Sequence, residues 1–148
     1  MPYKTTRVHS RANNAGQDRH PAETRESLAR MLGEAGIVLD GDKLRRLWRY
    51  HELIRSHNDD YDLTRLRNFR DFAVKHYIDC LMVPTLVKLP SPLLDIGTGA
   101  GFPGIPLKIG VPECGIILSE SRSKRVAFLE MAVRELGLEG IEVLDRKS

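Results

Sequence analysis

The residues best suited to chemistry lie between Leu93 and Gly104, which read Leu-Leu-Asp-Ile-Gly-Thr-Gly-Ala-Gly-Phe-Pro-Gly. A short apolar run ends here, and glycines follow at the alternate positions 97, 99 and 101. This pattern predicts a buried strand that ends in a tight turn. Glycines at this spacing let backbone N–H groups approach a ligand without an intervening Cβ, and a helix just beyond would offer further free donors. We interpret the stretch as a ligand-binding turn; the alternative is a turn that only connects a strand to a helix.

The kind of ligand follows from the residues around these glycines. A dinucleotide-binding fingerprint reads Gly-x-Gly-x-x-Gly/Ala, and counted from Gly97 its last position is Phe102, which is too bulky for the close helix–strand packing of that site. This argues against a nicotinamide-dependent enzyme. The pattern Asp95-x-Gly97-x-Gly99-x-Gly101 instead resembles motif I of the class I S-adenosylmethionine (SAM) methyltransferases, whose cofactor has no pyrophosphate to hold.

A second candidate group follows the next apolar run. Ile116 to Leu118 predicts another strand, which ends at Glu120, and Ser121 is expected to open an amphipathic helix over residues 124–136. A carboxylate at the tip of this strand, beside the glycine turn, is well placed to accept both hydroxyls of an adenosine ribose. Glu120 is therefore our candidate ribose ligand; the alternative is a solvated acid at a strand end.

Helical periodicity precedes the sheet. The pattern predicts one helix over residues 22–36, a second that is capped by Asp40 and broken by residues 58–60, and a third from Phe69 to the region of Pro84. The apolar stripe of the second helix is formed by Leu44, Leu47, Trp48 and His51. We expect Trp48 in the core, and His51 as a buried, hydrogen-bonded histidine rather than a ligand.

Two further residues of the third helix, His76 and Asp79, are three positions apart. They share a helix face and could hydrogen-bond one another, or form an ordinary surface pair. No Ser/His/Asp, Cys/His or paired-carboxylate arrangement stands out, so we assign no catalytic acid or base.

The composition indicates one ordinary domain in a chain of 148 residues, with 41% hydrophobic and 29% charged residues. No apolar run reaches the length of a membrane span and none resembles a signal peptide, so we expect a cytoplasmic protein without a membrane partner. Cys80 and Cys114 stand alone, which supports neither a disulfide framework nor a metal site. Both are expected to be small apolar residues.

The net charge of +3 is carried by the first 20 residues, which contain Lys4, Arg7, Arg11 and Arg19 against Asp18. This segment is poor in apolar residues and is predicted to be a disordered basic tail. It could be an arm that binds the phosphates of a nucleic acid, or a solvated leader without a role. A transit peptide is the weaker third alternative, because the segment shows little amphipathic order.

Longer blocks of sequence identify a family. Residues 76–81 (His-Tyr-Ile-Asp-Cys-Leu), the glycine-rich block continued through Phe-Pro-Gly-Ile-Pro-Leu at 102–107, and residues 120–129 (Glu-Ser-Arg-Ser-Lys-Arg-Val-Ala-Phe-Leu) resemble the glucose-inhibited division protein B family. Its members are bacterial methyltransferases that modify ring nitrogen seven of one guanine in 16S small-subunit ribosomal RNA. The resemblance runs from roughly residue 25 to residue 145. It implies SAM as cofactor and small-subunit ribosomal RNA as partner, with no metal.

The resemblance also implies roles for individual residues. Gly97 and Phe102 would contact SAM, Gly99 and Gly101 would shape the turn, and Glu120 would lie at the ribose with Ser121 beside it. His76 and Asp79 match a family His-x-x-Asp pattern and would lie near the cofactor. The chain departs from the family at residues 62–64, where Asp-Leu-Thr replaces the usual Asn-Leu-Thr, and at His57, where a tryptophan is common.

The resemblance implies an α/β fold, with N-terminal helices followed by the first half of a class I SAM-methyltransferase Rossmann-like sheet. The chain divides into the tail (1–20), a helical region (21–88) and a partial SAM-binding Rossmann-like domain (89–148). A complete seven-stranded sheet would need roughly 150 residues from Leu93 onward, and the sequence ends at Ser148. We therefore expect a C-terminally truncated enzyme.

Truncation has two expected consequences. In the usual strand order 3-2-1-4-5, the first strand becomes an exposed apolar edge that invites self-association. SAM binding should be weak because the site loses one wall.

The alternative to an active rRNA methyltransferase is an inactive fragment that binds RNA. We rank a nicotinamide-dependent enzyme third, after these two. An intact relative would need no general base, since the guanine ring nitrogen carries a lone pair and no proton, so positioning and electrostatics would dominate catalysis.

Overall fold

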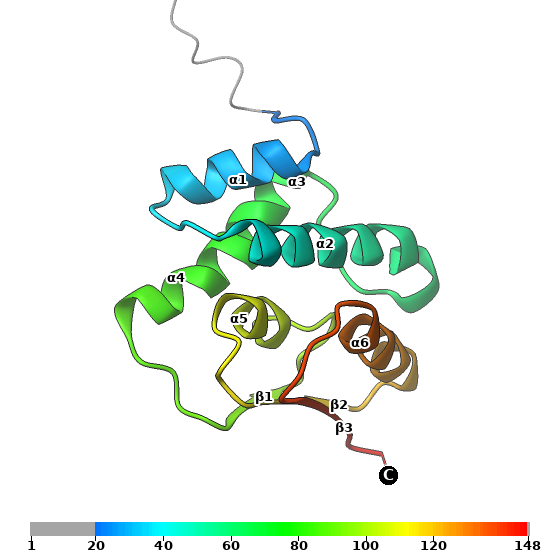
Figure 1. Ribbon diagram of the computed structural model, residues 1–148. Coiled ribbons are helices and arrows are strands. Elements are labelled where there is room, and N and C mark those ends of the chain that lie inside the picture. The colour runs from blue at the N-terminus through cyan, green and yellow to red at the C-terminus, as the bar shows by residue number, and fades with distance from the viewer. Residues whose placement is uncertain (1–19, 148) are drawn as a thin grey trace, which may run out of the picture.

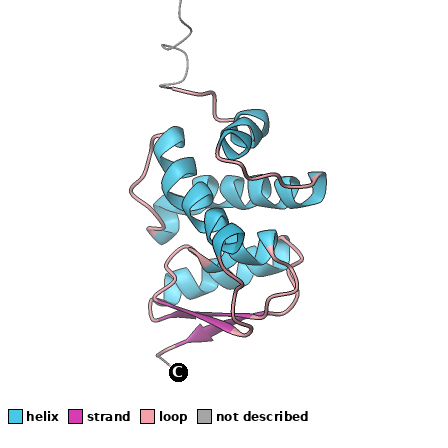
Figure 2. Ribbon diagram, turned by 90° about the vertical axis from the view of Figure 1, so that its left-hand side faces the viewer, coloured by secondary structure: helices cyan, strands magenta, loops and turns pink. Residues whose placement is uncertain are grey.

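The computed structural model describes residues 20–147, so the predicted basic tail up to residue 19 lies outside the described residues. Helices lie over one face of a parallel sheet (Figures 1 and 2). The elements in chain order are α1 (Arg25–Glu34), α2 (Gly41–Tyr61), α3 (Phe69–Phe72), the π-helix η1 (Ala73–Ile78), α4 (Asp79–Leu86), β1 (Leu93–Ile96), α5 (Gly104–Gly110), β2 (Ile116–Glu120), α6 (Ser123–Glu135) and β3 (Ile141–Asp145). This confirms the expected α/β class, with helices before a partial Rossmann-like sheet.

The sheet has the spatial order β1-β2-β3 within the described residues, and both pairings are parallel. Parallel neighbours require crossover connections, and α5 and α6 supply them on the same side of the sheet (Figure 2). Along β1, Asp95 is buried while Leu94 and Ile96 are 52% and 66% exposed. One face of the sheet therefore packs under helices, and the other is uncovered in this part of the chain.

Helix α2 is the centre of the core. It crosses over α5 and α6 (Figure 1) and buries Leu47, Tyr50 and Ile54 along one stripe against them. Trp48 is only half-buried and packs against the edge of this core. The predicted character of His51 is borne out: its ring is buried, Nδ1 lies 2.8 Å from the Tyr77 hydroxyl and Nε2 lies 2.6 Å from Glu23 Oε1.

Two helix boundaries differ from those predicted. Helix α1 begins at Arg25, because the Thr24 hydroxyl accepts the Ser27 N–H as an N-cap. Helix α2 continues through residues 58–60 and ends at Tyr61, followed by the C-cap Asp62, which has a left-handed backbone (φ 51°). The predicted break was wrong because the Asn58 side chain does not compete with its own helix. Its amide oxygen accepts N–H groups from the loop that follows.

The third predicted helix is a continuous helical segment over residues 69–86, with a π-helical stretch, η1, in its middle. The residue pattern gave no indication of this π-helix. Pro84 lies inside α4 rather than ending it, and the helix continues to Leu86. Within residues 20–147, no helix combines the length and the apolar character needed to cross a bilayer.

Candidate functional site

The glycine turn leaves the carboxyl end of β1 and is fastened to the end of β2. The N–H groups of Gly97 and Thr98 both donate to the Ser119 carbonyl, at 2.8 and 3.2 Å. Gly97, Gly99 and Gly101 all have positive φ, at 68°, 63° and 110°, which only glycine adopts without strain. A Cβ built on Gly97 or Gly99 would meet no atom within 4 Å. The turn therefore has a fixed backbone and open space at these two glycines.

The Asp95 side chain stabilises the turn through two hydrogen bonds. Its Oδ2 accepts the Thr98 hydroxyl at 2.6 Å and the Gly104 N–H at 3.0 Å, so one carboxylate oxygen holds the beginning of the turn and the start of α5. Burial raises the pKa of Asp95, against the opposing effect of these two hydrogen bonds. Asp95 is thus an internal support of the turn and is nearly inaccessible to solvent.

The structure brings Glu120 to the same turn. Its Oε2 accepts the Gly99 N–H at 2.9 Å, and its Oε1 accepts the N–H groups of Ser121 and Arg122, each at 3.0 Å. Burial favours the neutral acid, but these backbone donors outweigh it and lower the pKa of Glu120. The result is an ionised carboxylate at the end of β2, within hydrogen-bond distance of the glycine turn.

These bonds also correct the start of the following helix. Ser121 does not open it: the N-cap is Arg122, which has an extended backbone, and α6 begins at Ser123. The backbone amides of residues 121 and 122 turn back onto Glu120 instead of entering the helix. Ser121 is half-buried and stays beside the carboxylate.

Phe102 lies at the end of the turn, against the helical region. Its ring stacks flat on the imidazole of His76, with centroids 4.0 Å apart and an interplanar angle of 10°. The rings of Tyr50, Phe72 and Tyr77 surround it at 5.6, 6.0 and 6.1 Å. The helices before the sheet therefore form an aromatic wall on one side of the turn.

The suggested hydrogen bond between His76 and Asp79 is not formed. The Nε2 atom of His76 is buried and has no hydrogen-bond partner among the described residues, while Asp79 is exposed. The imidazole is turned towards Phe72 and Phe102 instead. Burial lowers the pKa of His76, with Lys75 adding to the effect and Asp79 opposing it.

Sequence reasoning missed two residues of this region. The buried Tyr50 hydroxyl donates to the Ala100 carbonyl at 2.5 Å and ties α2 to the turn. Burial raises the pKa of Tyr50 well above its ordinary value. Gly104 is the point where α5 touches the sheet, because a Cβ there would collide with Leu118. The helical spacing of Leu47, Tyr50 and Ile54 could have indicated that Tyr50 is buried. The signal for Gly104 was its place directly after Phe102 and Pro103, where the next helix begins.

The segment that departs from the family pattern forms a bridge between helices. The Asp62 carbonyl accepts hydrogen bonds from the Arg125 guanidinium at 2.8 and 3.2 Å, which joins the end of α2 to the start of α6. His57 lies about one turn earlier in α2, and the centroid of its ring is 6.2 Å from that of Phe128. In residues 20–147, no cluster of His, Cys, Asp and Glu side chains could hold a metal ion, and both cysteines are buried and unpaired.

Comparison with known proteins gives a consistent result. Residues 43–147 match the family described as rRNA small subunit methyltransferase G (GidB). The chain is 47% identical over 131 residues to ribosomal RNA small subunit methyltransferase G 2 of Syntrophobacter fumaroxidans, covering 88% of this chain and 26% of that protein. It is 40% identical over 124 residues to ribosomal RNA small subunit methyltransferase G of Carboxydothermus hydrogenoformans, covering 82% of this chain and 52% of that protein.

A further relative gives the same proportions. The chain is 42% identical over 125 residues to the ribosomal RNA small subunit methyltransferase G of Pelotomaculum thermopropionicum, covering 83% of this chain and 51% of that protein. The chain thus spans about half the length, or less, of these curated relatives. Because the family match covers most of its residues, the chain belongs to the rRNA small subunit methyltransferase G family.

Proposed function

We propose that this chain carries the cofactor-binding half of an enzyme that transfers the methyl group of SAM to ring nitrogen seven of a guanine in small-subunit ribosomal RNA. One observation carries the proposal: in a member of an rRNA methyltransferase family, an ionised carboxylate and a glycine turn meet at the carboxyl ends of adjacent parallel strands. Ligands of open parallel sheets bind at this edge.

The residues present fit SAM. The open space at Gly97 and Gly99 can receive the ligand next to the backbone, and the Phe102 ring offers an apolar surface beside it. A carboxylate has about four acceptor positions, and the bonds found among the described residues leave one position of Glu120 Oε2 without a donor. Because Glu120 is only 4% exposed, we propose that a ribose hydroxyl reaches this oxygen through the open space at Gly99. We propose as cofactor-binding residues Gly97, Gly99, Gly101, Phe102, Glu120 and Ser121.

The chemistry asks the protein mainly for position. When bound, SAM would supply a methyl group on a positively charged sulfonium. The guanine nitrogen would attack this methyl with its own lone pair while the C–S bond breaks and its electrons stay on sulfur, which leaves as a neutral thioether, so no side chain has to remove a proton. Asp95 and Tyr50 hold the backbone of the turn, and Glu120 fixes Gly99 against β2. Such preorganisation is the main way in which an enzyme lowers the barrier of a transfer without acid–base steps.

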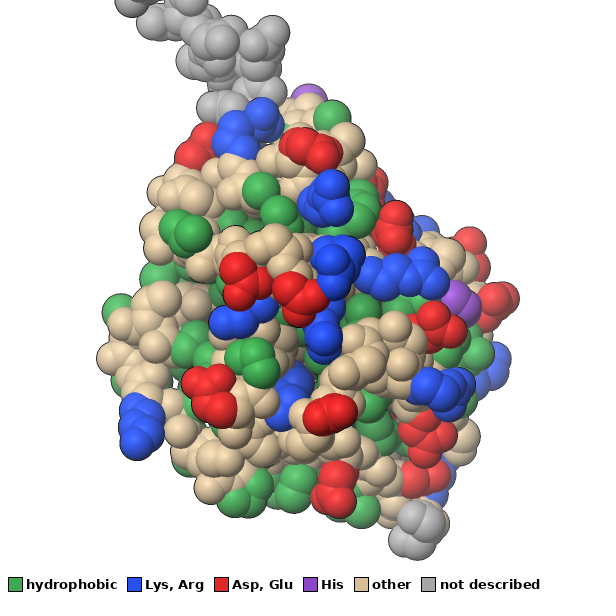
Figure 3. All heavy atoms as spheres, viewed as in Figure 1, with side chains coloured by type: hydrophobic (Ala, Val, Ile, Leu, Met, Phe, Trp, Pro, Cys, Tyr) green, Lys and Arg blue, Asp and Glu red, His purple; other side chains and the backbone are tan. Residues whose placement is uncertain are grey.

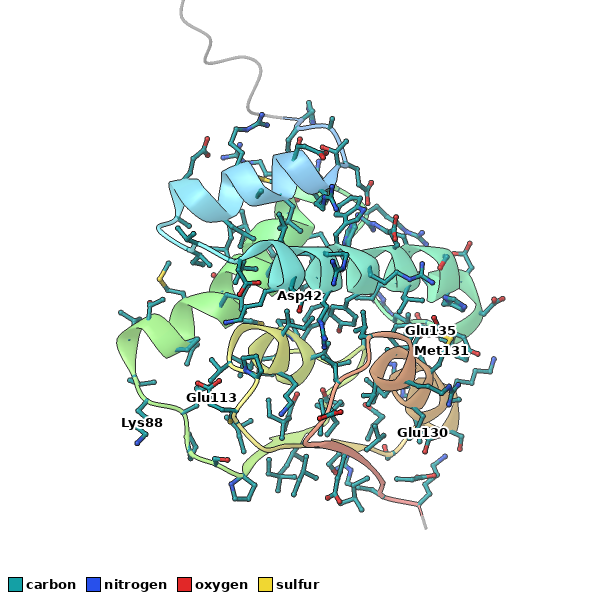
Figure 4. All side chains as sticks on the ribbon, in the orientation of Figure 1. Asp42, Lys88, Glu113, Glu130, Met131 and Glu135 are labelled. Atoms are coloured by element: carbon teal, nitrogen blue, oxygen red, sulfur yellow. The ribbon has the colours of Figure 1, made fainter. Side chains whose placement is uncertain are left out.

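The alternative function, RNA binding without methyl transfer, receives less support from α2. Three of its arginines lie beside acids: Arg45 and Arg46 share Asp42, and Arg49 pairs with Glu52 and Glu135. Figure 3 shows acidic and basic side chains interleaved on this face, and Figure 4 shows Asp42 on α2 and Glu135 on α6. A paired surface attracts phosphate less than a stripe of one sign.

The test is a thermal melt of the purified chain with excess SAM, with NAD as the control ligand. A ligand at about 100 times its Kd stabilises the native state by about 2.7 kcal/mol, which raises Tm by several degrees in a domain of this size. We expect a shift with SAM and none with NAD. No shift at millimolar SAM, or an equal shift with NAD, would contradict the proposal.

Substitution of the carboxylate sharpens this test. Glu120→Gln should weaken SAM binding about tenfold or more, because hydrogen bonds to a charged acceptor are about twice as strong as neutral ones. Glu113→Gln is the matched control: Glu113 is exposed in the α5–β2 loop (Figure 4). It should leave the affinity unchanged. Methyl transfer to 16S ribosomal RNA, measured with labelled SAM, then separates an active enzyme from a fragment that only binds cofactor.

We also propose that the uncovered sheet supports self-association. Within the described residues β1 pairs only with β2, and Leu94, Ile96 and Leu144 are exposed on one face. An apolar edge of this kind pairs readily with another chain. Ile96→Lys should shift the sedimentation coefficient towards the monomer. Val38→Lys, in the α1–α2 loop and 89% exposed against 66% for Ile96, should not. A chain that is monomeric at all concentrations would refute this proposal.

A further inference from the structure

Phe102 is held more closely by His76 than by any other aromatic ring around it. The two rings lie 4.0 Å apart and nearly parallel, whereas Tyr50, Phe72 and Tyr77 approach at 5.6 Å or more with tilted or edge-on geometry. Aromatic pairs contribute about 0.5–1.5 kcal/mol beyond the burial of their surface. Among the described residues, His76 is thus the nearest ring to Phe102 and the one that lies nearly parallel to it.

The π-helix explains how one helical segment presents so many rings to Phe102. In an α-helix successive side chains are separated by about 100°, so positions 72 and 77 would diverge by about 140°. The hydrogen bonds of a π-helix run from i to i+5, and the wider turn advances each residue by a smaller angle. Phe72, the last residue before η1, and His76 and Tyr77 within η1 all reach the same phenylalanine. Such turns are frequent at functional sites.

Ring contacts, rather than a hydrogen bond at Nε2, orient His76. This nitrogen is buried and has no partner among residues 20–147, and the imidazole meets the Phe72 ring in a T-shaped arrangement with centroids 4.7 Å apart. An unpaired buried polar atom costs about 1–3 kcal/mol, so this nitrogen does not help to hold the ring among the described residues. The flat face of the imidazole against Phe102 is the contact that distinguishes His76.

We propose that His76 is a positioning residue of the cofactor site, which holds the Phe102 ring in place through the stack and so couples the N-terminal helices to the glycine turn. The inference rests on the proposed function, because it takes Phe102 as a SAM contact. It goes further in assigning control of cofactor affinity to a residue on η1. The His76 side chain acts through Phe102 and has no chemical step of its own.

The experiment compares His76→Ala, His76→Phe and the control Val74→Ala in the whole chain. Val74 lies on the same π-helix and is 39% exposed. SAM affinity is measured by titration calorimetry, and amide exchange is measured in the unliganded chain. We expect His76→Ala to weaken SAM binding about fivefold to tenfold and to speed exchange at Gly101 and Phe102, whose N–H groups bond to the Thr98 carbonyl. His76→Phe should restore both, and Val74→Ala should change neither.

The two readouts separate the possible failures. If the unaltered chain binds no SAM, the proposed function fails, and amide exchange alone still decides whether His76 positions the turn. A purely structural role would speed exchange throughout the core, including β2, instead of in the turn alone. The inference is overturned if His76→Ala leaves exchange in the turn unchanged, if Val74→Ala has the same effect, or if His76→Phe does not restore the protection.

Discussion

Replacing Gly104 by alanine should be costly although it adds a single methyl group. The new Cβ would overlap Leu118 Cδ2, and it would lie 3.0 Å from Asp95 Oδ2 and 3.4 Å from Ile116 Cγ2. Leu118 is completely buried and cannot swing away without displacing the core. Overpacking of this kind costs about 1–3 kcal/mol. The same displacement would disturb the carboxylate that holds Thr98 and Gly104.

Gly41→Ala is the matched control, because Gly41 is also the first residue of its helix and a Cβ there meets no atom within 4 Å. A Gly→Ala change without strain stabilises by about 0.4–1 kcal/mol through the unfolded chain. The two variants should therefore differ by about 1.5–4 kcal/mol in the free energy of unfolding, or roughly 5–15 °C in Tm. Denaturant titration and thermal melts measure this difference. Equal stability of the two variants would refute the close-packing argument.

Further predictions concern stability. Lys108→Met should lower the free energy of unfolding by at least about 2 kcal/mol, because the buried ammonium donates to the carbonyls of Pro112 and Cys114, which would lose this donor. Lys88→Met, at an exposed position before β1 (Figure 4), should be neutral. Tyr50→Phe should cost about 1–2 kcal/mol in the same titration, since a buried carbonyl of the turn loses its hydroxyl donor. Acidification should destabilise the chain: burial lowers the pKa of His51 and of His76 below 6.5, so the unfolded state takes up protons first and stability falls as the pH drops below that value. Denaturation at pH 7 and pH 5.5 checks this, and a steady stability over that interval would contradict it.

Much of the fold could be read from local pattern. The strands that begin near residues 93 and 116 and the helix that follows Glu120 could be predicted from short apolar runs and helical periodicity, which indicate elements that bury one face. The order of the strands was expected from the fold that the family resemblance implies, and the structure has this order among the described residues. The positions of the turn and of Glu120 at neighbouring strand ends follow from the geometry of a parallel sheet, because parallel strands place their carboxyl ends at one edge.

Other features depend on contacts between distant residues. The side chain opposite a glycine decides whether that glycine allows close packing of a helix on a strand. Leu118 faces Gly104. Gly104 therefore has the packing role that a dinucleotide-binding fingerprint would give to position 102. The tie from Tyr50 to Ala100 joins residues 50 positions apart. The sequence shows such residues as ordinary members of a helix or a turn.

The sequence by itself thus determined the elements, their order along the chain and the residues that meet at the sheet edge, because these depend on periodicity and on chain topology. Only the tertiary structure decided how the turn is held: Asp95 as an internal brace, Glu120 fixed by backbone amides, and Phe102 stacked on His76. Hydrogen bonds and ring stacking depend on distances of a few ångströms and on orientation, and these are set only when the helices and the sheet pack together.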